Sequence, residues 1–193
     1  MMRKKPIYII LVLLILCSAT YFFTSQFGYS FNEKSVLLKS FPFQNGHVVY
    51  QKEFGNNKIV IWDTGDKKYA KVVKVAWGML YQVRNISEML PREPNDFISR
   101  TWSASLNSTG RYETIFAVEA KNPDIEKVII SNDHIDHKIS DQLKEIKQKS
   151  SVYIELKVQD GFAVSYNELP MNDVGNFVFR GLDHKGQIIT VGR

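Results

Sequence analysis

The sequence predicts a mainly β fold, a β-sandwich or partly open barrel with one short surface helix, after an N-terminal transmembrane helix. Residues 6–23 carry no charge, which indicates a segment that enters a membrane. From residue 47 onward, turn-forming residues recur about every 8–12 positions, a spacing typical of all-β domains. Residues 152–158 alternate apolar and polar side chains, as a strand with one buried face does.

The first element is an apolar helix behind a short basic tail. Arg3, Lys4 and Lys5 belong to the tail (residues 1–5), and a transmembrane anchor follows at residues 6–24. The uncharged run would rise about 27 Å as a helix, close to the thickness of a bilayer's hydrocarbon core. Because basic residues stay on the cytoplasmic side, we expect a single-pass cell membrane protein with its N-terminus inside and its C-terminal domain outside.

Two other interpretations of this segment stay open. An apolar run that ends in Cys17, Ser18 and Ala19 is also compatible with a cleaved signal, after which the protein is secreted. With Leu14 three residues ahead of Cys17, the run is also similar to a bacterial lipoprotein signal. Cys17 is the only cysteine, so the predicted exported part has no disulfide and no cysteine-based zinc site.

A stalk or linker at residues 25–46 is expected to connect the anchor to an extracytoplasmic β-rich domain at residues 47–193. Within the stalk, residues 30–33 (SFNE) are expected to start a short helix that runs through Val36, Leu37 and Leu38. Turns rich in Gly and Asn, which accept a positive φ, separate the early strands of the domain. We expect strands at 48–54, 58–62, 69–75, 79–83, 101–106, 112–120 and 125–130, and a loop at 86–99. The segments 69–75 and 79–83 form either two strands or one long strand that is interrupted at Trp77 and Gly78.

The second half of the domain is expected to begin with a surface helix. Ile139, Leu143 and Ile146 are spaced i, i+4 and i+7, which predicts a helix within residues 138–149 that lies on the sheet. A sub-boundary near 121–124 is an alternative to a single β unit. The remaining strands are expected at 152–158, 162–166, 177–182 and 187–191, the last two as a terminal hairpin.

The charge of the chain excludes a strongly basic domain. The formal net charge is +5, and Arg3, Lys4 and Lys5 account for three of these charges. The rest of the chain is therefore close to neutral, which argues against nucleic acid as a partner. Hydrophobic residues make up 44% of the sequence and aromatic residues 12%, which excludes a disordered protein.

The densest group of potential metal ligands is His134, Asp136 and His137, which follow a predicted strand. The group is similar to the last positions of the metallo-β-lactamase signature, whose first histidine is Asn132 here. A catalytic zinc site needs three protein ligands and an open position, and His184 is the only histidine further along that could contribute. The favoured interpretation is a polar surface turn, and the alternative is a metal site.

The three tryptophans, Trp62, Trp77 and Trp102, all fall in the strand-rich first half. Aromatic side chains in strands usually belong to a core or to cross-strand pairs, and we expect the same of these. The alternative is a row of exposed rings on a sheet, which would bind a glycan or a peptide.

The sequence contains no Gly-x-Ser-x-Gly elbow and no glycine-rich phosphate loop. We therefore assign no catalytic residue and no cofactor, and predict a membrane-anchored binding or interaction module outside the cytoplasm. Its partner would be another envelope protein, a peptide or a wall polymer. The alternatives are an envelope hydrolase that uses the His/Asp metal site, and a cleaved, secreted structural protein.

The chain resembles small membrane-anchored or secreted proteins of Bacillus-type Gram-positive bacteria. The resemblance rests on the basic start with a single apolar segment, on residues 58–65 (KIVIWDTG) and on residues 175–189 (GNFVFRGLDHKGQII). It implies an extracytoplasmic location and a β architecture, and it carries no activity and no catalytic residue.

Overall fold

The computed structural model describes residues 5–43, 45–91, 96–133 and 142–192. The described chain starts with two helices, α1 (Lys5–Gln26) and α2 (Glu33–Lys39), and continues mainly as strands, with a third short helix, α3 (Leu143–Lys149), and one 3-10 turn, η1 (Met171–Asp173). The strands are β1 (His47–Phe54), β2 (Asn57–Asp63), β3 (Lys68–Ala76), β4 (Leu80–Glu88), β5 (Ile98–Leu106), β6 (Tyr112–Ala120), β7 (Lys127–Ser131), β8 (Tyr153–Lys157), β9 (Phe162–Leu169), β10 (Val178–Leu182) and β11 (Ile188–Gly192).

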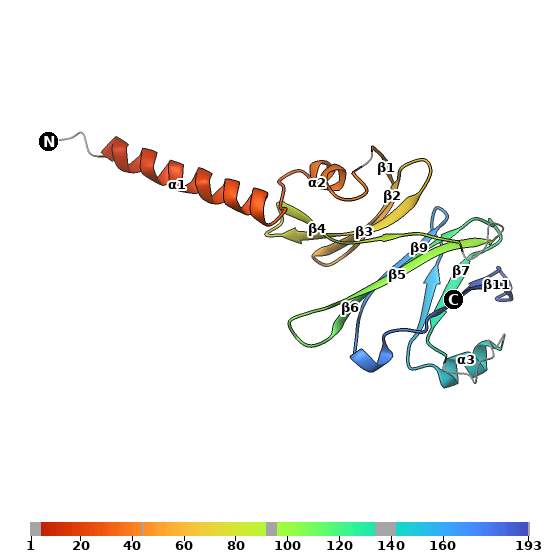
Figure 1. Ribbon diagram of the computed structural model, residues 1–193. Helices are drawn as coiled ribbons and strands as arrows, with labels where there is room; N and C mark the ends of the chain where they lie inside the picture. The colour runs from red at the N-terminus through yellow and green to blue at the C-terminus, as the bar shows by residue number, and fades with distance from the viewer. Residues whose placement is uncertain (1–4, 44, 92–95, 134–141, 193) are drawn as a thin grey trace.

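The strands form three antiparallel sheets that lie in layers (Figure 1). The first sheet has the order β1-β2-β3-β4, the middle sheet β5-β6-β9 and the third sheet β11-β10-β7-β8. The prediction of a mainly β fold is confirmed, and the layered arrangement agrees with the β-sandwich alternative. The middle sheet takes β9 from the second half of the chain, so residues 121–124 mark the passage from the middle to the third sheet.

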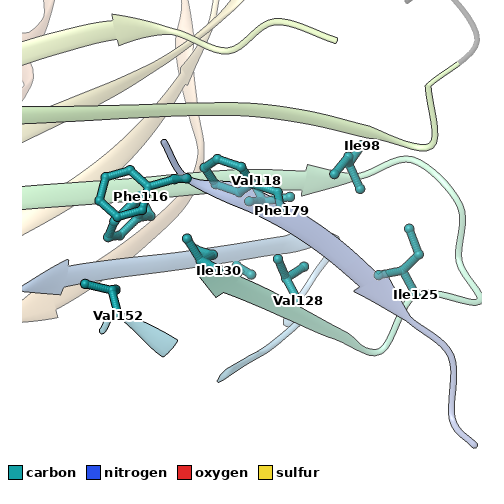
Figure 2. Packing of buried hydrophobic residues seen from close by; sticks show 10 residues of the cluster. Ile98, Phe116, Val118, Ile125, Val128, Ile130, Val152 and Phe179 are labelled. Atoms are coloured by element: carbon teal, nitrogen blue, oxygen red, sulfur yellow. The ribbon is translucent and has the colours of Figure 1, made fainter. Parts of the chain in front are cut away.

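The middle sheet is apolar on both faces because its strands alternate side chains between two cores. On β6, Ile115 and Ala117 face the first sheet, whereas Phe116 and Val118 face the third sheet. The first core includes Ile59, Ile61, Val72 and Val164. The second core includes Ile98, Val128, Ile130, Val152 and Phe179, which Figure 2 shows between the ribbons of the two sheets.

Helix α2 covers the outer face of the first sheet. The side chain of Asn32 caps the helix, because its Oδ1 accepts a hydrogen bond of 3.1 Å from the backbone N–H of Ser35. Leu37 is buried against Trp62 and other residues of the sheet. The short helical pattern expected in the stalk is therefore confirmed, and this part of the stalk belongs to the folded domain.

Helix α1 leads away from the sheets (Figure 1). The large apolar side chains between Ile7 and Leu16 are each more than half exposed, so no part of the described domain covers them. Searched over the described residues alone, the structure contains no helix whose length and hydropathy suffice to cross a membrane. Arg3 and Lys4 of the predicted basic tail lie outside the described residues, and α1 begins at Lys5.

Several element boundaries differ from the expected ones. Strand β4 continues through Glu88 and β5 begins at Ile98, so the expected loop at 86–99 is shorter than predicted. Helix α3 begins at Leu143, and residues 138–141 of the predicted helix lie outside the described residues. The hydrogen bonds of neighbouring strands explain the longer β4, which pairs with β3 up to Glu88.

Candidate functional site

The predicted metal ligands His134, Asp136 and His137 lie outside the described residues. His184, the additional ligand considered, lies exposed in the turn between β10 and β11. Among the residues that the structure describes, no group of three or more His, Cys, Asp or Glu side chains could hold a metal ion. The metal-site interpretation of the three residues stays a prediction.

The residues just before this group are buried, so the expected polar surface turn is wrong for Asn132 and Asp133. Arg180 donates two hydrogen bonds to the Asp133 carboxylate, at 3.0 Å from Nη1 and 2.7 Å from Nη2. Ser131 Oγ donates to the same carboxylate at 2.8 Å. Burial raises the pKa of Asp133, but these hydrogen bonds outweigh it and keep the pKa below its ordinary value of 3.8. The cluster therefore acts as a structural ion pair.

A second cation, Lys71 of β3, is buried beneath α2, and no carboxylate among the described residues pairs with it. Its Nζ donates hydrogen bonds of 2.9 Å to the backbone oxygen of Leu37 and to Oγ of Ser40, at the C-terminal end of α2. The ammonium group also lies 4.8 Å from the centre of a Trp62 ring. Burial lowers the pKa of Lys71 from 10.5 to about 8. The helix end and the ring supply the negative potential that a carboxylate would otherwise provide.

The best candidate for a binding site is a polar cleft between the first and the middle sheet, with a volume of about 390 Å³. It lies between β3 and β4 on one side and β5 and β6 on the other. Val72 and Ile115 belong both to its lining and to the first apolar core, so the cleft borders that core. Three amide side chains line it, those of Asn57, Asn85 and Asn107. Each amide offers both hydrogen-bond donors and an acceptor.

Charged and aromatic side chains complete the walls of this cleft. Lys74 of β3 and Arg84 of β4 supply two cations. Tyr166 of β9 donates a hydrogen bond to the carboxylate of Glu113, and burial together with this carboxylate raises the pKa of the phenol. The ring of Tyr166 lies beside that of Phe54, with the ring centres 6.3 Å apart. The cleft therefore combines amides, one carboxylate, two cations and an aromatic ring.

Local irregularities of the strands place these groups. The register of β3 and β4 shifts between Val72 and Val73, which leaves Arg84 as an unpaired residue beside Asn85. The amide of Asn85 lies 3.4 Å from Oγ of Ser105 on β5, so one polar contact bridges the two sheets at the cleft. In the following turn, Oδ1 of Asn107 accepts hydrogen bonds from the backbone N–H groups of Thr109 and Arg111.

The cleft could not be predicted from the sequence because its residues come from six strands and a turn and form no local motif. One feature of the sequence did indicate the cleft. Lys74 follows Ala70 and Val72 on the inward face of β3, where the alternation would place an apolar residue. A polar residue at an inward position near a strand end marks either an open edge or a cleft.

The three tryptophans have three different environments, and the expectation of a core or cross-strand position holds for Trp62 and Trp102 but not for Trp77. Trp62 is buried under α2, and its indole N–H has no hydrogen-bond partner among the described residues. Trp102 is partly exposed and packs edge-on against Phe177, with ring centres 5.0 Å apart. Trp77 is 79% exposed in the turn between β3 and β4.

Two features of the described chain bear on its function, the polar cleft and the exposed apolar helix α1. The chain matches no protein-family model, no curated protein and no solved structure with which it was compared.

Proposed function

We propose that the protein is a single-pass, membrane-anchored binding module whose β domain, outside the cytoplasm, takes an anionic wall saccharide in the cleft between β4 and β5. Helix α1 is the anchor, and Arg3, Lys4 and Lys5 keep the N-terminus inside. The class of ligand is inferred from the polar lining of the cleft. Another envelope protein or a peptide would need a larger apolar contact than this cleft offers.

The case for the anchor rests on residues 6–23 and on the environment of α1. The run is uncharged, and its length as a helix of about 27 Å approaches that of the hydrocarbon core. The large apolar side chains of α1 between Ile7 and Leu16 are all exposed and do not pack on the described domain. A helix that is hydrophobic all round needs either a large protein core or a membrane, and the described domain gives it no core.

The case for a saccharide rests on the side chains of the cleft. Amides such as Asn85 pair with adjacent hydroxyl groups, which accept and donate hydrogen bonds together. Tyr166 adds an aromatic surface for the apolar face of a sugar ring. Lys74 and Arg84 exceed the single carboxylate of Glu113, so the site favours an acidic saccharide over a neutral one. The volume lies within the usual range for small-molecule sites, about 300–1,000 Å³.

Binding is tested with the full-length protein in lipid nanodiscs, titrated with a purified anionic wall polysaccharide and with the same polymer after removal of its acidic groups. We expect the anionic form to bind more tightly and the difference to shrink as salt is added. The Arg84→Gln variant should lose about tenfold in affinity for the anionic polymer, which corresponds to ~1.4 kcal/mol. Arg84 is exposed, so this variant should keep the stability of the fold.

The matched control is Lys157→Gln, which removes one exposed charge from β8 in the third sheet, away from the cleft. It should bind the polymer as the unmodified protein does. Equal affinities of the two variants, or no binding of either polymer, would overturn the saccharide proposal.

The anchor is tested with Cys17, the only cysteine of the chain, which is exposed on α1. In intact cells a membrane-impermeant maleimide should leave Cys17 unlabelled, and labelling should appear after detergent is added. In a Cys17→Ser background, Asp124→Cys places a cysteine at an exposed position of the domain and should be labelled in intact cells. Rapid labelling of Cys17 without detergent would contradict the anchor, and protection of Asp124→Cys would contradict the orientation.

A further inference from the structure

The turn between β3 and β4 carries a tryptophan that the fold does not require. The N–H of Met79 donates to the backbone oxygen of Ala76 at 3.2 Å, and the two residues between them have positive φ angles, 51° for Trp77 and 71° for Gly78. Glycine and asparagine favour this left-handed conformation, and a bulky side chain there is rare. With 79% of its surface exposed, Trp77 gains no packing in return.

The same turn lies beside the end of α1, as Figure 1 shows. Ser30 and Tyr81 exchange backbone hydrogen bonds of 2.9 and 2.8 Å, which join the segment after α1 to the start of β4. The side-chain amide of Gln82 also donates to the backbone oxygen of Phe27 at 2.5 Å. These contacts hold the turn at the level where α1 ends.

Further exposed apolar side chains lie in the turn and after the end of α1, and one lysine lies near the end of α1. Phe27 and Phe31 after α1, and Met79 in the turn, are each at least half exposed. Lys39 on α2 lines a cleft of about 590 Å³ together with Tyr21 of α1. Exposed aromatic rings beside lysines are the composition of protein surfaces at the level of lipid headgroups.

We propose that the turn formed by Trp77, Gly78 and Met79 enters the headgroup region of the bilayer that α1 spans. The inference rests on the proposed anchor, because α1 sets the level of the turn relative to the lipid. The occupant of this surface is therefore lipid rather than a second protein. With α1 and the turn both in the membrane, the domain is held at two points, and the cleft between β4 and β5 keeps a fixed orientation above the surface.

The test uses the full-length protein in vesicles of phosphatidylcholine and phosphatidylglycerol that contain brominated lipids. Bromine near the headgroups should quench part of the tryptophan fluorescence, and bromine at the bilayer centre should quench it less. Quenching should largely disappear in Trp77→Asn. It should persist in Trp102→Phe, the matched control, because Trp102 lies on β5 against Phe177.

A second measurement separates lipid contact from a structural role. Because asparagine accepts the left-handed conformation better than tryptophan, Trp77→Asn should unfold at the same or a higher temperature while it loses the quenching. A lower unfolding temperature, or equal quenching of Trp77→Asn and the unmodified protein, would overturn the inference.

Protection of Cys17 from the impermeant maleimide is measured in the same vesicles. If Cys17 is protected and quenching is absent, the inference about the turn fails and the anchor stands. If Cys17 is labelled, the anchor itself fails.

Discussion

In the described part of the chain, Lys71 and Arg180 are both fully buried cations, but the two are held in opposite ways. Arg180 in the third sheet has a full counter-charge, since both oxygens of Asp133 accept its hydrogen bonds. Lys71 in the first sheet has only a backbone oxygen, a hydroxyl group and an aromatic ring. One site is an ion pair, and the other is a cation among dipoles.

The difference shows how each site responds to a change of protonation. Asp133 keeps its charge down to low pH because Arg180 lowers its pKa, so the ion pair persists over the physiological range. Lys71 releases its proton near pH 8, more than two units below its ordinary pKa, because burial penalises the charged form. The first sheet and α2 therefore meet around a group that titrates close to neutrality.

The largest expected effect comes from breaking the ion pair. Arg180→Met removes the guanidinium that pairs with the buried Asp133 carboxylate, and should lower the free energy of unfolding by about 3–5 kcal/mol. Chemical unfolding of the full-length protein in detergent, followed by fluorescence, measures this. The double variant Arg180→Met/Asp133→Leu should recover most of the loss, because no uncompensated charge remains. A loss below about 1 kcal/mol in the single variant would show that the pair is not buried.

The next effect is a pH dependence that belongs to Lys71. Folded protein releases this proton near pH 8 and the unfolded chain near pH 10.5, so the unfolded state binds more protons between these values. The contribution of Lys71 to stability therefore rises with pH across this window, by roughly 3 kcal/mol. Lys71→Met should lack the rise. Parallel curves of stability against pH for the two proteins would contradict the lowered pKa.

A smaller effect tests how tightly Gly46 packs against Trp62, whose ring lies beside Lys71. A Cβ atom on Gly46 would lie 2.5 Å from Nε1 of Trp62 and 2.5 Å from the backbone oxygen of Asp63. Gly46→Ala should therefore cost about 1–3 kcal/mol of stability. The neighbouring Asn45→Ala, at an exposed position, should change stability little and serves as the control. Equal stability of both variants would mean that Trp62 can move away.

The smallest effect is expected for an ion pair on the surface of the third sheet. Lys127 and Glu155 pair at 2.8 Å, but each side chain is 49% exposed. Lys127→Gln should leave the free energy of unfolding nearly unchanged, and added salt should reduce any difference further. A loss comparable to that of Arg180→Met would remove the distinction between buried and exposed pairs on this sheet.

The sequence predicted the local elements well, because each depends on nearby residues. Alternation located β8, turn residues separated β1 from β2, and residues 30–33 marked the start of α2. The division into three sheets could not be predicted from the sequence, since alternation shows which side chains share a face of a strand but not which strand lies opposite. The pairing of β9 with β6 is such a long-range choice.

A related physical reason explains why the buried cations and the cleft were not predicted. Lysine and arginine are rarely buried, so a pattern analysis assigns Lys71 and Arg180 to the surface. Both residues lie in strands whose other side chains are mostly apolar, and this pattern was the one sequence signal that the two cations are buried. The cleft depends on the register shift at Val72 and on the bridge from Asn85 to Ser105, and neither follows from the order of residues.

The position of β9 in the middle sheet also has a consequence for how the chain is made. β5 and β6 are synthesised well before β9, and until β9 arrives one edge of β6 has no hydrogen-bond partner. A nascent chain that has been synthesised only as far as Ala120 therefore exposes an incomplete sheet with an unpaired edge and two apolar faces. The middle sheet therefore cannot be completed until β9 (Phe162–Leu169) has been synthesised.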